Sequence, residues 1–180
     1  MIEATESFLN YNLNNATPFV TAPFSMSISI DAHIPFPRPL VYATYRDKLT
    51  ELVSYMPKVR QIKFKSRQEQ DGLLYLVHEW SGGANIPAVA RAFLSEDLLN
   101  WTENSIWNNS EYTNSWHIKT HVFTEAVRCT GKNHFLKDDR GTLIQTQVEL
   151  IIDPSQIKGT PQQLTVAIAM LQQPVLGNTF

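Results

Sequence analysis

The first clear pattern along the chain is an unbroken alternation of apolar and polar residues in "FSMSISID", residues 24 to 31. Phe24, Met26, Ile28 and Ile30 fall on one side and three serines on the other, which predicts a half-buried strand. After Pro39, apolar residues recur at intervals of three and four as far as Pro57. This spacing predicts one interrupted helix, or two short ones with the break near residues 47 to 50.

From residue 59 to about residue 153 the pattern is that of strands. Turn signals such as "QDG" at residues 70 to 72 and "DDRG" at residues 138 to 141 separate several of them. Such short links predict antiparallel neighbours, because parallel strands need long crossover connections. In the last strand Ile144 and Val148 alternate with Gln145 and Gln147, so one face of the sheet is expected to be wet. The predicted strands are Val59–Arg67, Leu73–Ser81, a short one near Ile86–Phe93, Asn100–Asn108, Ser115–Phe123, Val127–Lys137 and Thr142–Asp153.

The two ends of the chain differ from this central part. Residues 1–22 are rich in Asn, Thr and Ser, and we expect an N-terminal arm there, followed by one domain over residues 23–180. Near the other end, Thr160 and Pro161 form a helix start, with Thr160 as the N-cap. An apolar stripe that includes Ile168 follows, and Pro174 interrupts or ends the helix.

Composition narrows the class of protein. The chain has 180 residues, 43% of them apolar and 18% charged, with a formal net charge of −2, which is typical of one globular domain. No basic run suggests a nucleic-acid partner. The single cysteine, Cys129, excludes an intrachain disulfide. The acidic start does not fit a signal peptide, and no apolar run reaches the ~20 residues that cross a bilayer. We therefore expect a cytoplasmic protein without an integral membrane segment.

The order of elements, strand, helix pair, long antiparallel meander and final helix, resembles the helix-grip fold of the START and Bet v 1-like superfamily, also called SRPBCC. The resemblance covers roughly residues 24 to 180 and rests on "FSMSISID", the following "LVYATYRDKLTELVSYMP" and the strand with Trp101 and Trp107. It implies an α+β fold in which a curved antiparallel sheet wraps around a C-terminal helix, leaving an elongated apolar cavity between them. It implies no residue roles, because no catalytic signature unites the superfamily. The chain departs from the usual long final helix at Pro174.

The strongest candidate for a ligand-binding surface is the strand in "DLLNWTENSIWNNS". On a strand, whose side chains repeat every two residues, Trp101, Glu103, Ser105 and Trp107 share one face, whereas a helix would scatter them. A face that mixes aromatic and polar groups suits a ligand cavity better than a dry core. Packing of the tryptophans into the core is an equally good interpretation. The residues predicted to line the cavity are Tyr75, Trp101, Glu103, Trp107, Trp116, Ile144, Val148 and Ile168.

Catalytic and metal-binding patterns are weak in this sequence. Glu103 is the best candidate for acid–base work, although a solvent-facing position near the cavity mouth is the simpler interpretation of it. His117 and His121 should share an outward strand face, so no metal site is predicted there. "HE" at residues 78 and 79 is not HExxH, because Gly82 stands where the second His would be. Cys129 is expected to be an inert buried thiol. We predict no catalytic residue, metal or cofactor.

These observations favour a non-catalytic protein that binds or transports a small hydrophobic or lipid-like molecule between the sheet and the C-terminal helix. The first alternative is an enzyme on the same fold, of the polyketide cyclase or aromatase kind. The second is a protein-interaction module that uses a sheet edge or the N-terminal arm. The sequence does not predict the oligomeric state.

Overall fold

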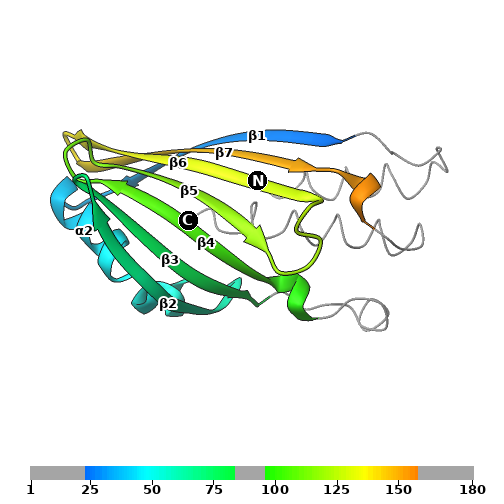
Figure 1. Cartoon of the computed structure of the whole chain (residues 1–180). Helices are drawn as coiled ribbons and strands as arrows, with labels where there is room; N and C mark the ends of the chain where they lie inside the picture. Colours follow the sequence, from blue (N-terminus) through cyan, green and yellow to red (C-terminus); the bar gives the residue numbers. More distant parts are fainter. Residues whose placement is uncertain (1–22, 84–95, 158–180) are drawn as a thin grey trace.

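The computed structural model describes residues 23–83 and 96–157, which form one curved antiparallel sheet with short helices beside it (Figure 1). Its seven strands lie in the order β1-β7-β6-β5-β4-β3-β2. The elements are β1 (Phe24–Ile34), α2 (Arg38–Asp47), the 3₁₀ helix η1 (Leu49–Tyr55), β2 (Val59–Gln70), β3 (Leu73–Gly82), the 3₁₀ helix η2 (Glu96–Leu99), β4 (Asn100–Asn108), β5 (Thr113–Thr120), β6 (Val127–Asp138), β7 (Gly141–Ile152) and the 3₁₀ helix η3 (Pro154–Gln156).

The strands predicted from alternation are confirmed wherever the structure describes them. β4 has the bounds that the sequence predicts, and β1 and β2 each run three residues further than predicted. Asp71 and Gly72 join β2 to β3 with φ values of 53° and 76°, the left-handed pair that a tight hairpin turn requires. The predicted strand at residues 86–93 and the arm at residues 1–22 lie outside the described residues, as does the helix from Thr160.

The main difference from the predicted strands is at β5, which ends at Thr120 and not at Phe123. Phe123 has a φ of 58°, a left-handed conformation that no strand contains. The Ala126 N–H donates to the Phe123 carbonyl at 2.9 Å, so residues 121–126 form a turn that leads into β6. Apolar Val122 and Phe123 made this turn look like a continuation of the strand.

The interrupted helix is also confirmed, as two short ones. α2 begins at Arg38 with Pro39 in its first turn and ends at Asp47, and η1 begins at Leu49. Lys48, between them, has φ −120° and ψ 20° and is not helical. Within residues 23–83 and 96–157, no helix has the length and apolar character needed to cross a membrane.

Alternation along the strands gives the sheet two faces. On β3 the buried side chains Leu74, Leu76, His78 and Trp80 point to one side, here called the inner face. The register pairs His78 with Glu103 of β4, so the inner face of β4 carries the predicted Trp101, Glu103, Ser105 and Trp107. The wet outer face that β7 predicted is present, with Gln147 and Glu149 exposed on it.

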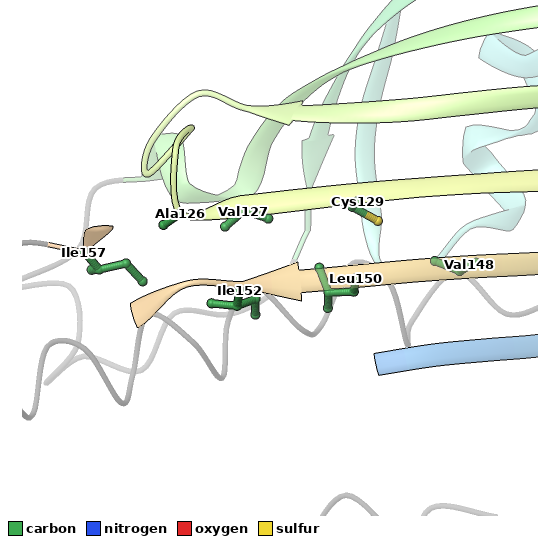
Figure 2. Packing of buried hydrophobic residues seen from close by; sticks show 7 residues of the cluster. All are labelled: Ala126, Val127, Cys129, Val148, Leu150, Ile152 and Ile157. Carbon is green, nitrogen blue, oxygen red and sulfur yellow. The ribbon is translucent and has the colours of Figure 1, made fainter. Parts of the chain in front are cut away.

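Among the described residues, three groups of buried side chains lie on the inner face. The α2 cluster packs that helix on one end of the sheet and contains Val41, Tyr42, Leu74, Leu76, Trp107 and Phe135. The η1 cluster lies over β2, β3 and β4 and contains Leu49, Met56, Val59, Ile62, Trp80 and Trp101. The β6–β7 cluster, shown in Figure 2, contains Ala126, Val127, Cys129, Val148, Leu150, Ile152 and Ile157.

Candidate functional site

One row of side chains crosses the inner face through the middle of the sheet. Antiparallel pairing places His78 of β3 opposite Glu103 of β4, Glu103 opposite Ile118 of β5, and Ile118 opposite Cys129 of β6. Cys129 in turn lies opposite Leu150 of β7. We call these five residues the central row. Directly opposite residues have Cβ atoms about 5 Å apart, so neighbouring side chains of the central row are close enough to interact.

Glu103 is the carboxylate of the central row. Burial raises the pKa of this carboxyl from its ordinary value of 4.5 to about 7. In the described part of the chain, the Glu103 carboxylate forms no hydrogen bond or ion pair with another side chain. The side chain is partly buried and faces inward. The sequence favoured a solvent-facing Glu103 near the cavity mouth, whereas the structure partly buries this side chain, and the burial raises the pKa of its carboxyl.

His78 lies directly across from Glu103 and is 4% exposed. Its Nδ1 atom is buried and has no hydrogen-bond partner. Burial lowers the pKa of the His78 imidazole, so the ring is neutral at neutral pH. A buried nitrogen without a partner destabilises the folded state, because folding removes its hydrogen bond to water and puts no other hydrogen bond in its place. The Phe64 ring packs against the imidazole at 5.8 Å between centroids and leaves this nitrogen unsatisfied.

Tyr45 is the contribution of α2 to the same region. Its ring centroid lies 6.1 Å from that of Trp107 and 5.9 Å from that of Phe135, so the phenol stands over the inner face. Burial raises the pKa of Tyr45, and the negative charge of Glu103 raises it further. The same two causes, in the same order, raise the pKa of the Cys129 thiol to about 12. Both groups therefore hold their protons near pH 7 and both lie within electrostatic reach of Glu103.

Trp101 and Trp107 share the inner face as predicted, yet each is packed into a different cluster. Trp101 is 4% exposed and stacks on Trp80 at 5.7 Å. Trp107 is 2% exposed, lies edge-on to Tyr42 at 5.2 Å, and donates its Nε1–H to the Ser105 hydroxyl at 3.0 Å. For these two rings the structure favours the core-packing interpretation.

Trp116 differs from them because it is only partly buried. Its indole lies against the backbone of Gly131, where any larger residue would overlap with the ring. The register places Trp116 opposite Gly131 and Gly131 opposite Val148, so Trp116 and the predicted Val148 flank a residue with no side chain. Ile144, also predicted, lies on the inner face opposite Phe135 and packs with the α2 cluster.

Two predicted lining residues are not brought to this region. Tyr75 alternates with buried Leu74 and Leu76 and therefore lies on the outer face, so its place among the lining residues is wrong. Both faces of the β3 sequence are apolar, which left the inward set undetermined until the pairing with β4 was known. Ile168 lies outside the described residues.

His78 and Tyr45 are the residues that the sequence reasoning missed. A signal for His78 existed, since Glu79 would make the opposite face of β3 the wet one and leave His78 inward beside Trp80. Tyr45 belongs to the apolar stripe of α2. The spacing of that stripe predicts that Tyr45 faces the sheet, but it does not predict that the side chain lies near a carboxylate. As predicted, His117 and His121 are exposed. In the described ranges, no group of three or more His, Cys, Asp or Glu side chains could hold a metal ion.

Solved structures share this architecture at low sequence identity. An aromatase/cyclase, Zhui, from a Streptomyces species is 11% identical with a TM-score of 0.52, over 88% of this chain and 90% of that one. Norcoclaurine synthase from Thalictrum flavum is 8% identical with a TM-score of 0.52, over 90% of this chain and 94% of that one. The di-domain aromatase/cyclase BexL is 14% identical with a TM-score of 0.54, over 86% of this chain and 46% of that longer one.

No family model matches the chain. No curated protein matches its sequence. The solved structures nevertheless confirm the predicted fold, a curved antiparallel sheet with a helix pair after the first strand. The C-terminal helix predicted for that fold falls in residues 158–180, outside the described residues.

Proposed function

We propose that the chain binds a small, largely apolar molecule on the inner face of the sheet, over the central row. The observation that carries this proposal is the pair formed by Glu103 and His78, two polar side chains that face inward without partners in the described structure. Proteins rarely leave such groups unsatisfied, and a bound molecule that supplies a hydrogen bond removes the cost. Partly buried Trp116 and Ile118 beside them offer apolar surface for the rest of the ligand.

The fold neighbours support the same proposal at the level of architecture. The neighbours named above are an aromatase/cyclase and norcoclaurine synthase. Because the identities are near 10%, the likeness supports a binding face and does not transfer any substrate.

The direct test uses the full chain purified without added ligand. Native mass spectrometry should show a small molecule that leaves on solvent extraction. The extracted protein should then bind the neutral fluorophore N-phenyl-1-naphthylamine. With fluorine-labelled tryptophan, the resonance of Trp116, assigned with Trp116→Phe, should shift more than that of packed Trp107. A chain that carries no molecule, binds no fluorophore and shows no shift at Trp116 contradicts the proposal.

An enzyme that moves protons is the second candidate, and one observation favours it. The pKa of Glu103 is about 7, which suits a general acid or base that works near neutral pH. Unpartnered His78 directly opposite could hold a carbonyl or hydroxyl oxygen while Glu103 removes or returns a proton. Glu103→Gln keeps the shape of the side chain and removes this ability. Loss of turnover with unchanged substrate affinity in that variant would favour the enzyme over the binding protein.

A further inference from the structure

The inner face has a marked charge asymmetry around the central row. Glu103 is the only carboxylate on the inner face of β1 and β3 to β7 in the described ranges. The only basic side chain on that same surface is Lys137, which is exposed near the end of β6. On edge strand β2, Arg67 is engaged by Asp47 at 3.0 Å. Within this part of the molecule, the charge of Glu103 therefore has no basic counterpart.

The titratable groups that face Glu103 do not compensate its charge. They are Tyr45 from α2, His78 from β3 and Cys129 from β6, while β5 presents only Ile118. Burial keeps all three neutral near pH 7, since it raises the pKa of the phenol and the thiol and lowers that of the imidazole.

Aromatic rings surround this uncompensated carboxylate. Trp101 lies two residues before Glu103 and Trp107 four residues after it on the same face of β4, and Trp116 lies diagonally from it on β5. Aromatic faces attract organic cations that approach within about 6 Å of the ring, and a neighbouring carboxylate adds a charge-assisted hydrogen bond. An apolar molecule with one protonated amine would satisfy both features at once. A ligand that carries a carboxylate would be repelled by the negative charge of Glu103.

We propose that the ligand of the inner face is an aromatic or aliphatic amine, bound as its ammonium ion against Glu103 with its apolar part over Trp116 and Ile118. This inference rests on the proposed function, which it narrows to one chemical class. It requires that binding is coupled to a proton. Near pH 7 about half of the Glu103 side chains are protonated in the free protein, and the ammonium ion favours the ionised form, so binding releases a proton from Glu103.

The test compares three probes of similar size with the full chain: 2-phenylethylamine, 2-phenylethanol and 3-phenylpropionate. Their affinities are measured by calorimetry at about pH 5.5 and about pH 8.5, where Glu103 is mainly protonated and mainly ionised, while the amine stays charged. At the higher pH the amine should bind about tenfold more tightly than the alcohol, and the carboxylate should bind least. At the lower pH the preference for the amine should shrink to less than about twofold.

Two variants and one further measurement sharpen the result. Glu103→Gln should lose the preference for the amine at both pH values and keep its affinity for the alcohol. Glu149→Gln, on the exposed outer face of β7, removes the same charge and should behave as the unaltered chain. Calorimetry in two buffers of different ionisation enthalpy should show proton release near pH 7 with the unaltered chain, and none with Glu103→Gln. Proton release separates recognition of the amine from a merely structural effect of the substitution.

The outcomes separate this inference from the proposed function. If N-phenyl-1-naphthylamine and 2-phenylethanol bind but the amine shows no preference at the higher pH, binding on the inner face stands and the inference is overturned. If the preference survives in Glu103→Gln, another group recognises the amine and the inference is again overturned. If none of the probes binds and the fluorophore also fails, the proposed function is contradicted together with the inference.

Discussion

The burial of Glu103 has a consequence for stability that can be measured without any ligand. The pKa of the carboxyl is about 7 in the folded chain and near its ordinary value of 4.5 when unfolded. The folded state therefore binds the proton more tightly, so Glu103 makes the fold less stable as the pH rises from about 4.5 to about 7. The difference corresponds to roughly 3 kcal/mol, because one pKa unit is worth about 1.4 kcal/mol. Since Glu103 is only partly buried, this value is an upper bound.

Glu103→Gln removes the ionisation and keeps the size of the side chain. We expect the variant to match the unaltered chain in free energy of unfolding near pH 4.5 and to exceed it by up to roughly 3 kcal/mol near pH 8. Urea denaturation followed by tryptophan fluorescence measures both values, and Glu149→Gln is the matched control with an exposed carboxylate. If Glu103→Gln is the less stable chain at pH 8, the carboxylate has a stabilising partner and the reasoning on its uncompensated charge fails.

Three other predictions concern the packing around the central row. Gly131→Ala should lower the free energy of unfolding by about 1–3 kcal/mol and shift the Trp116 fluorescence, because the new Cβ overlaps with the indole; an unchanged spectrum would contradict the contact. Leu74→Ala, at a position 1% exposed, should cost about 2–5 kcal/mol in urea denaturation, and a cost under 1 kcal/mol would mean that the α2 cluster refills the space. The Cys129 thiol, with its pKa raised to about 12 by burial, should react with a thiol reagent far more slowly in the folded chain than in urea at about pH 8; equal rates would refute its burial.

Much of the sheet could be predicted from the sequence because one of its faces is wet. The alternation in β1 and β7 specifies which side chains face inward, and both strands were predicted with the correct inward set. The break between the two short helices was likewise visible, because the apolar spacing shifts near Lys48. In β5 the apolar pair Val122 and Phe123 imitated a strand, and only the left-handed backbone of Phe123 shows the turn.

The candidate site was predicted only in part, and the reason is register. The face of β4 that carries Trp101, Glu103 and Trp107 follows from a period of two, as expected. Which residue of β3 lies across from Glu103 depends on pairing between strands that are separated by residues 83–99, a connection too long for a tight hairpin turn to set the register. The pairing of His78 with Glu103 therefore became visible only with the structure. The burial of Glu103 could not be predicted from the alternation within β4 either, because burial depends on what packs against the inner face.

The pairing of β1 with β7 has a consequence for how the chain is made. Phe24 lies opposite Ile152, so the first and last strands of the described chain are hydrogen-bonded neighbours. During synthesis β1 emerges first, but its partner strand is translated last of the seven. Until Ile152 has been translated, β1 lacks its partner strand and its apolar face (Met26, Ile28 and Ile30) stays exposed. The nascent chain is prone to aggregate during this time. The pairing of the first strand with the last is the longest-range contact of the sheet, and contacts of this kind slow folding.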